Sequence, residues 1–475
     1  MVEPTHVVIL GAGPAGVGAA FQLHRTGRAS AAVVEQREVV GGNAGSFEIA
    51  GQRVDYGSHR LHPSCKPEIL SDIRSLLGGE LVKRPRHGRI RLSGRWIHFP
   101  LRPLDLGLRL DRGFTFGALR DMAARSVGRG PDEGDSFAGV LRAHLGRTVY
   151  DRFYGPYAKK IWGVEPEDLS AEQARRRVAA DTPGKLLRKM LGRLPGMKPV
   201  GFRHFYYPRR GYGAISEAYA AAAEEQGAEL HLGWRIEKVE RPPAPGERWR
   251  VVARRGEDRR SIEGDHVWST IPIPLLARLL SPSPPESVLE ASEGIDYRAM
   301  LLVYLTLPVE RFTEFDAHYF PEPEVALTRL SEPKNYTDIG EPRGRTTICA
   351  ELPSSTDDAW WGLSDAEMGE RVAADLERVG LPLPARPGTV TVRRLAQAYP
   401  IYRRGYEAPF TRLDRWLGEL PGLLSFGRQG LFAHDNTHHA LAMAYAAADC
   451  LREGVFDRER WSAYRKEFEA HVVED

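Results

Sequence analysis

The sequence is poor in cysteine. It contains three cysteines in 475 residues, Cys65, Cys349 and Cys450, and none of them belongs to a CxxC pair. Disulfide-rich secreted domains and zinc sites need more cysteines or regularly spaced ones. We therefore expect neither a disulfide framework nor a metal centre, and a reducing cytoplasmic location fits this usage of cysteine.

The sequence also lacks long hydrophobic runs and a strong excess of either charge. The apolar run near the N-terminus, residues 6–10, ends at glycines, whereas a helix that spans a bilayer needs about 20 apolar residues. The net charge is +3, and proteins that bind nucleic acid usually carry a concentrated basic face. We expect no targeting segment, no membrane span and no nucleic-acid partner.

One local excess of positive charge lies between Arg175 and Arg210. The stretch contains eleven lysines and arginines and a single acid, Asp181. A solvated helical face would explain it. Attraction to phosphate, on a nucleotide, on a lipid-linked substrate or at a membrane surface, would also explain it, and would predict peripheral membrane association that weakens with salt.

The first elements form a dinucleotide-binding pattern. Residues 6–10 (HVVIL) predict a buried strand, and a glycine-rich turn leads from it into a helix. The turn carries the three glycines of a GxGxxG motif, Gly11, Gly13 and Gly16. Glycine there permits the tight turn, the approach of a pyrophosphate to the helix N-terminus, and close packing of helix on strand. A second strand, residues 31–35, ends in Glu35, which is placed to bind ribose hydroxyls.

A second glycine pair, Gly41 and Gly42, follows this acid. It is more typical of FAD than of NAD sites, because the longer dinucleotide continues toward its isoalloxazine ring. The segment VDYGSHRLHP then carries His59 and His62, whose spacing could serve a metal pair, a catalytic base or the edge of a cofactor. No third ligand cluster with suitable spacing accompanies them, which argues against a metal.

The stretch EQREVVGGNAGSF, with VDYGSHRLHP after it, resembles the flavin-binding start of UDP-galactopyranose mutases, which belong to the wider superfamily of amine oxidases and protoporphyrinogen oxidases. Asn43 after the glycine pair fits the mutase branch, because amine oxidases usually have GGR. The resemblance implies noncovalent FAD with the histidine segment against its ring, so His59 and His62 become catalytic candidates. Up to residue 59 it implies the cofactor-binding residues Gly11, Gly13, Gly16, Glu35, Gln36, Arg37, Gly41, Gly42, Asn43, Ser58 and His59.

Residues 153–178, FYGPYAKKIWGVEPEDLSAEQARRRV, are similar to an aromatic-rich mutase segment. The resemblance makes Tyr157, Trp162 and Arg177 candidates for substrate binding, with Arg176 as an alternative to Arg177. Aromatic faces can stack on a base, and guanidinium groups can bind phosphate oxygens. Tyr157 and Trp162 could equally be core residues of a helical bundle.

Later segments extend the resemblance to about residue 450. ALTRLSEPK and AQAYPIY match mutase segments, and LLSFGRQGLFAHDN looks like the closing strand and GR-x-G turn of the superfamily. The resemblance implies substrate contacts for Arg329, Tyr399 and Arg428, with Arg329 also a catalytic candidate. It implies cofactor contacts for Val239, Arg428, Asp435 and Asn436.

The chain departs from the mutases after the GR-x-G turn, where His434 and Asn436 replace a tyrosine and an aspartate. Two chemistries therefore stay open. A mutase-like enzyme would act on a phosphate-bearing, nucleotide-linked or lipid-linked sugar through N5 of reduced flavin, with NADPH as a candidate reductant. An oxidoreductase would take hydride from an organic small molecule in a mostly apolar cleft, with His434 as the candidate base.

The predicted architecture is α/β. A discontinuous Rossmann-type FAD-binding domain of the GR2-like kind is expected from residues 1–75, 205–290 and 395–475. Residues 76–204 are interpreted mostly as amphipathic helices inserted into it. Residues 291–394 alternate like strands and predict a sheet-rich substrate domain.

Overall fold

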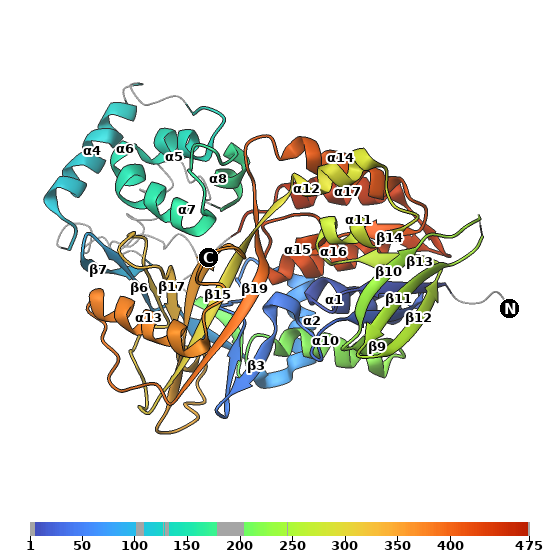
Figure 1. The fold of residues 1–475 in the computed structure, drawn as a ribbon, viewed down its shortest axis with the longest axis horizontal. Helices are drawn as coiled ribbons and strands as arrows, with labels where there is room; N and C mark the ends of the chain where they lie inside the picture. The colour runs from blue at the N-terminus through green and yellow to red at the C-terminus, as the bar shows by residue number, and fades with distance from the viewer. Residues whose placement is uncertain are drawn as a thin grey trace.

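The computed structural model describes residues 5–100, 109–126, 128, 133–177, 204–244 and 246–473. Two sheets dominate the fold (Figure 1), a parallel five-stranded sheet and a mixed seven-stranded sheet. The helices α4 to α8 form a separate group at the upper left of Figure 1, next to the seven-stranded sheet. This arrangement confirms the predicted α/β class.

The parallel sheet has the strand order β20, β13, β1, β2, β9. In that order its strands are Leu423–Ser425, His266–Ser269, His6–Leu10, Ser30–Glu35 and Glu229–Leu232. All four pairings are parallel. Strands β1 and β2 are almost entirely buried, as expected when other elements cover both faces of a sheet.

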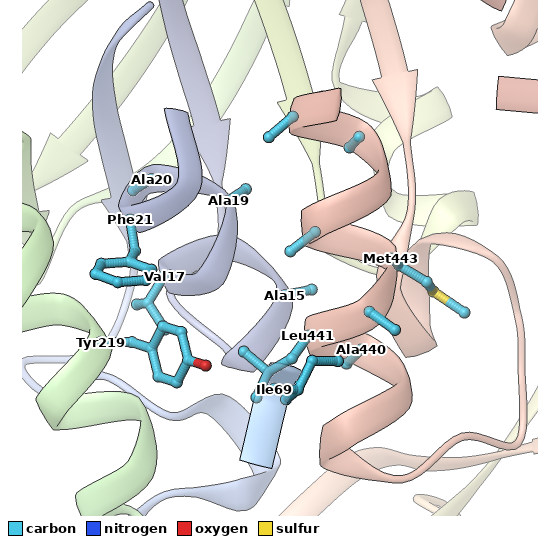
Figure 2. Close-up of a cluster of buried hydrophobic side chains, with 14 of the residues drawn as sticks. Ala15, Val17, Ala19, Ala20, Phe21, Ile69, Tyr219, Ala440, Leu441 and Met443 are labelled. Atoms are coloured by element: carbon cyan, nitrogen blue, oxygen red, sulfur yellow. The ribbon is translucent and has the colours of Figure 1, made fainter. Parts of the chain in front are cut away.

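Helices cover one face of this sheet. They are α1 (Pro14–Arg25), α2 (Pro67–Leu77), α10 (Ala214–Glu225), α16 (Thr437–Cys450) and α17 (Arg458–Glu469). Figure 2 shows small side chains of α1 facing α16, with Tyr219 of α10 and Ile69 of α2 close by. A Cβ on Gly18 of α1 would lie 2.8 Å from Leu441 Cδ2 of α16, so glycine permits this close approach.

The opposite face is covered by a four-stranded sheet and by further helices. The strands, in order, are β12 (Asp258–Gly264), β11 (Trp249–Arg255), β10 (Arg235–Glu240) and β14 (Leu280–Ser281). The helices are α11 (Ile273–Leu279), α12 (Glu286–Glu293) and α14 (Glu407–Glu419). Side chains of β1 alternate between the two layers, with Val7 and Ile9 on the first face and Val8 and Leu10 on the second.

The seven-stranded sheet has the order β19, β15, β18, β17, β16, β6, β7. In that order the strands are Thr389–Ile401, Asp296–Leu307, Thr346–Ser354, Arg329–Ser331, Ala317–Tyr319, Gly88–Leu92 and Arg95–Phe99. Strands β15 and β18 are almost wholly buried, and α13 (Asp365–Arg378) packs against the sheet. The long strands β15 and β19 pair with each other, and the chain runs from the last of these strands into α14, which packs against the part built on the parallel sheet.

The segment between residues 76 and 204 departs from the helical prediction. It begins with three strands, β5 (Leu81–Pro85), β6 and β7. Strand β5 pairs with β8 (His204–Pro208), and the β6–β7 hairpin extends the seven-stranded sheet. The hairpin turn, Ser93–Gly94, has positive φ at both residues, which suits the twist of a two-residue hairpin. The period-2 alternation of GRIRL is the available signal for this hairpin, and the prediction of helices did not take it into account.

Helices follow this hairpin: α4 (Arg112–Ser126), α5 (Phe137–Leu145), α6 (Arg147–Val149), η3 (Tyr150–Tyr154), α7 (Gly155–Trp162) and α8 (Ala171–Arg177). Most of the predicted basic stretch, residues 178–203, lies outside the described residues. No helix in the described part of the chain is long and apolar enough to cross a bilayer. The remaining short elements are η1 (Gly42–Ala44), β3 (Ser46–Ile49), β4 (Gln52–Asp55), η2 (Gly78–Glu80), η4 (Pro333–Tyr336), α15 (Gly427–Gly430), β21 (Leu451–Arg452) and β22 (Val455–Phe456).

Candidate active site

The turn after β1 has the geometry that a dinucleotide requires. Gly11 has a φ of +96°, a conformation that favours glycine. A Cβ on Gly16 would lie 1.9 Å from Gly11 O, so a side chain there would force α1 away from the turn. A Cβ on Gly13 would meet no described atom within 4 Å, and Gly13 lines a cavity. The N-terminus of α1 therefore opens onto space that a phosphate group can enter.

Glu35 at the end of β2 is fixed by backbone N–H groups. Its side chain is buried, Oε2 accepts a hydrogen bond from Ala12 N at 2.9 Å, and Oε1 accepts one from Arg37 N at 2.9 Å. Glu35 lines the same cavity as Gly13. A carboxylate held at this position can accept hydrogen bonds from ribose hydroxyls, as predicted.

The second glycine pair touches the first turn. Gly41 and Gly42 have φ values of +106° and +53°. A Cβ on Gly42 would lie 3.3 Å from Gly13 Cα, so the two glycine turns are in close contact. Asn43 Nδ2 donates to Gln397 O at 3.1 Å, which links this segment to β19.

A cavity of about 490 Å³ extends from these turns to β15, β17 and β19. It brings together most of the predicted residues: Gly11, Gly13, Glu35, Gln36, Arg37, Gly42, Asn43, Ser58, His59, Arg177, Arg329, Tyr399, Arg428, Asp435 and Asn436. Gly16 and Gly41 shape the turns without lining the cavity. His62 and His434 do not line it, and Val239 packs in the core between the four-stranded and parallel sheets.

A second, smaller cavity of about 230 Å³ adjoins the first and shares Arg177, Arg329 and Tyr399 with it. We call it the aromatic chamber because of its wall, which includes Phe99, Phe137, Phe153, Tyr154, Tyr157, Trp162 and Tyr319. Tyr157 and Trp162 therefore lie where a substrate could contact them. Trp162 is also 3% exposed and packs edge-on against Tyr399, so it belongs to the local core as well.

Arg329 is held by Glu351 where the two cavities meet. Its Nε and Nη2 donate to the two carboxylate oxygens of Glu351 at 2.9 and 2.7 Å. Glu351 also accepts a hydrogen bond from Ser58 N at 2.8 Å and is 3% exposed. Because Glu351 neutralises Arg329, this arginine offers a phosphate less positive charge than the sequence predicted. Glu351 was not among the predicted site residues, although a lone acid inside the buried strand TTICAELP is an available signal.

Arg177 and Arg428 are the other predicted phosphate ligands. The guanidinium carbon of Arg177 lies 5.7 Å from the ring centroid of Trp162 and 5.5 Å from that of Tyr399. No carboxylate of the described residues forms an ion pair with Arg177. Arg428 donates to two backbone carbonyls, one of them of Asp435, and burial lowers the pKa of its guanidinium. Arg177 is therefore the more available cation of the two.

The two histidines of VDYGSHRLHP have different surroundings. His59 lines the larger cavity, stacks on Tyr212 with ring centroids 5.3 Å apart, and donates from Nε2 to Tyr56 O at 2.9 Å. Burial lowers the pKa of His59, so the ring is neutral and its Nδ1 carries no proton. His62 is buried away from the cavity, with its Nδ1 2.6 Å from Ser64 Oγ. Of the pair, His59 alone borders the cavity.

His434 is not placed to act as the base of an oxidoreductase. It is fully buried behind Trp162 and Tyr402 and lines neither cavity. Its Nε2 lies 3.2 Å from Gln173 Oε1, and burial lowers its pKa well below the usual value for histidine. The next residue, Asp435, lines the larger cavity instead.

Asp435 lies just before α16, and two imidazole groups lie beside its carboxylate. Its Oδ1 lies 3.1 Å from His471 Nδ1 and 3.2 Å from His439 Nδ1. These three side chains could offer ligands to a cation. However, a metal lies in the plane of each imidazole that binds it, and the rings of His439 and His471 are stacked 4.1 Å apart at an interplanar angle of 15°. Nearly parallel rings share no such point, so the geometry favours hydrogen bonds to the carboxylate over a metal site.

Comparison with known proteins identifies the family. Residues 14–448 match the family of flavin containing amine oxidoreductases. The chain belongs to this family. It is 28% identical to a phytoene dehydrogenase of Streptomyces griseus over 326 residues, which are 59% of this chain and 56% of that protein. It is 23% identical to a chloroplastic protoporphyrinogen oxidase of Oryza sativa subsp. japonica over 464 residues, 90% of this chain and 83% of the relative.

The fold is that of the resembled superfamily. A crystal structure of a reduced UDP-galactopyranose mutase superposes with a TM-score of 0.80 at 20% identity, covering 99% of this chain and 100% of the mutase. Family membership makes the chain an FAD-dependent enzyme, and the larger cavity fits FAD. The open N-terminus of α1, the oriented Glu35 and the second glycine turn suit the adenosine and diphosphate. The buried Asp435 Oδ2, which lacks a hydrogen-bond partner in the described chain, suits a hydroxyl group.

Proposed function

We propose that this flavoenzyme is mutase-like and acts on a phosphate-bearing sugar that is linked to a nucleotide or a lipid. The observation that carries the proposal is Arg177, which borders both cavities between Trp162 and Tyr399. A guanidinium beside two aromatic rings suits a nucleoside diphosphate, because the rings can stack on the base and the guanidinium can bind phosphate oxygens. The superposition on a mutase over 99% of the chain supports the same function.

Reduced flavin, when bound, supplies a nucleophilic ring nitrogen for such chemistry. The task of the chain itself is then to bind and orient the substrate. Arg177 and Arg428 would stabilise the negative charge of the diphosphate, and the walls of the aromatic chamber would keep water away from the sugar. His59 is neutral and fixed by Tyr56, so it can accept a hydrogen bond without adding charge at the flavin site.

Noncovalent attachment of FAD is part of this proposal, as are NADPH as reductant and a cytoplasmic location. The three cysteines are buried away from the larger cavity, and His59 Nε2 already donates to Tyr56 O. We expect acid precipitation of the purified protein to release all of the flavin into the supernatant. Colour that stays with the pellet would show a covalent bond and contradict this part.

The test of the proposed reaction is an anaerobic incubation of the reduced enzyme with UDP-sugars. We expect the ring form of the sugar to change, with reduced flavin required and no net consumption of reductant. Oxygen uptake or stoichiometric flavin reduction by another organic substrate, with UDP-sugars inert, would overturn the proposal.

A matched pair of variants tests the role of Arg177 directly. Arg177→Met should weaken UDP binding by about tenfold or more, because a charge-assisted contact to phosphate is lost. Arg175→Met is the control, since Arg175 lies on the same helix but is exposed and paired with Glu133. Isothermal titration of the oxidised enzyme with UDP measures the affinity of both variants. Equal affinities of the two variants would show that Arg177 does not contact the nucleotide.

An oxidoreductase is the second candidate, and the aromatic chamber favours it. Its wall suits a ring-bearing or hydrocarbon substrate. The phytoene dehydrogenase and protoporphyrinogen oxidase similarities point the same way. Because His434 is buried away from the chamber, such an enzyme would have to position its substrate without this base. The anaerobic experiment above separates the two candidates.

A further inference from the structure

The last described residues, 470–473, form what we call the C-terminal strap. They follow α17 and contact two distant parts of the chain. His471 Nδ1 donates to Asp435 Oδ1 at 3.1 Å, and Val473 N donates to Arg176 O at the end of α8 at 3.0 Å. Val473 is 7% exposed and lines the larger cavity. The strap therefore reaches both the α16 side of the cavity and the helical part that carries Arg177.

The two carboxylate oxygens of Asp435 are bound unequally. Oδ1 faces the imidazoles, whereas Oδ2 is buried and has no hydrogen-bond partner in the described chain. A buried carboxylate oxygen without a partner is costly in free energy. Asp435 lines the cavity that fits FAD, and FAD carries hydroxyl groups on its ribose and on its ribityl chain. A hydroxyl group of the cofactor would satisfy Oδ2.

His471 is the imidazole whose proton must point at this carboxylate. Asn436 N lies 3.3 Å from His439 Nδ1 and can only donate, so His439 Nδ1 cannot accept this bond and donate to Asp435 at the same time. His471 Nδ1 has no such competing donor among the described contacts. Its ring is held in place by stacking on His439 and by contact with Phe468 of α17. Burial opposes ionisation of Asp435, yet the two imidazole groups beside its carboxylate hold its pKa below the usual range.

We propose that His471 is a positioning residue for the cofactor: through the C-terminal strap it holds the Asp435 carboxylate oriented so that Oδ2 accepts a hydrogen bond from a hydroxyl group of FAD. The inference rests on flavin binding by the family and on the contacts above. It does not depend on whether the enzyme is a mutase or an oxidoreductase, so its failure would leave the proposed function untouched.

The test is a titration of flavin-free protein with FAD, followed by flavin fluorescence. His471→Ala removes the donor and should weaken FAD binding by about tenfold, as expected for a charge-assisted hydrogen bond. His471→Asn is the matched variant, because its side-chain amide places an N–H donor close to the position of Nδ1. We expect its affinity to stay within about threefold of that of the unmodified protein.

Two results would overturn the proposal: FAD binding by His471→Ala that equals that of the unmodified protein, or binding by His471→Asn that is as weak as that of His471→Ala. The melting temperatures of the flavin-free variants show whether the Ala change acts only on folding. Should His471→Ala not fold, His471→Leu gives a second test, because leucine has nearly the shape of asparagine but no N–H donor. FAD binding by His471→Leu should be about tenfold weaker than by His471→Asn, and equal binding by the two variants would overturn the proposal.

Discussion

At the scale of the residue, Arg329 and Glu351 form a buried ion pair whose energetics differ from those of a surface pair. Their side chains are 17% and 4% exposed. Removing one partner of such a pair leaves an uncompensated buried charge, which costs about 3–5 kcal/mol in other proteins, whereas replacing both partners by apolar groups is often neutral. A loss of ligand binding after Arg329→Ala must therefore be compared with its effect on folding.

We expect Arg329→Ala to lower the free energy of unfolding by about 3 kcal/mol, because Glu351 is left buried and unpaired. The double variant Arg329→Met with Glu351→Leu should recover most of that loss. Urea denaturation of the flavin-free proteins measures both values. An equal loss in the single and double variants would show that packing, and not the unpaired charge, sets the cost.

Gly13 and Gly16 belong to one motif, but substitutions at the two positions should have different effects. Gly13→Ala adds a methyl group to open space, so the free energy of unfolding should change by no more than about 0.5 kcal/mol while FAD content falls. Gly16→Ala places a methyl group 1.9 Å from Gly11 O, and such overpacking costs about 1–3 kcal/mol or more. Thermal melts and flavin absorbance distinguish the two. Full FAD content in Gly13→Ala would contradict the assignment of this turn to the cofactor.

At the scale of the element, the contact between α1 and α16 sets the geometry of the cavity. Both helices begin at its edge, where Gly13 precedes α1 and Asn436 precedes α16. Their small residues let the two helices approach closely, as Figure 2 shows. Larger side chains at this contact would move the two helix N-termini apart. Packing in this layer therefore acts on cofactor binding without any direct contact with the cofactor.

A double-mutant cycle at Gly18 and Leu441 tests this packing. Leu441→Ala should lower the free energy of unfolding by about 2–5 kcal/mol, as buried leucine truncations do. Gly18→Ala should also destabilise, because its methyl group would meet Leu441 Cδ2 at 2.8 Å. The double variant should lose less than the sum of the two, since truncation of Leu441 makes room for the methyl group. Additive losses in chemical denaturation would mean that the two positions are not in contact.

Elements with a clear local pattern could be predicted from the sequence, and side-chain directions in irregular segments could not. The β1–α1–β2 unit follows from its glycines and apolar strands. The β6–β7 hairpin was not predicted, although the alternation of GRIRL in β6 was visible; RWIHF in β7 does not alternate. Whether His434 or Asp435 enters the cavity depends on packing against Gln173, which is 261 residues away from His434 in sequence. Arg329 could likewise be predicted as a site residue, whereas its ion pair with Glu351 depends on the pairing of strands and could not be predicted from the sequence.

At the scale of the whole molecule, several histidines are buried and neutral. Burial lowers the pKa of His318 to about 3, and it lowers the pKa of His59 and of His434 below the ordinary value of 6.5. The unfolded chain binds protons at these histidines below about pH 6.5, whereas the folded chain does not until a lower pH. Acid therefore favours the unfolded state through each of them, and this part of the stability is fully present only above that pH.

His318 allows a direct measurement of this effect. As the pH falls from 6.5 toward the folded pKa of His318, which is about 3, this histidine should lower the free energy of unfolding by about 1.4 kcal/mol for each pH unit. His318→Phe removes the titrating group from a site lined by Trp96 and Phe315. In this variant the free energy of unfolding, measured by urea denaturation, should change less steeply with pH by that amount. Identical slopes in both proteins would show that His318 titrates equally in the folded and unfolded states.

The strand order of the parallel sheet also bears on how the enzyme is made. Central strand β1 pairs with β13, and β13 with β20, so the sheet needs segments from both ends of the chain. A ribosome releases the N-terminal residues first, at about 5–20 residues per second. Strand β1 emerges long before His266, and Asp435 and Val473 emerge later still. The cavity that fits the cofactor is therefore complete only after residues 435–473 have been synthesised, and until then the glycine-rich turn lacks part of its surroundings.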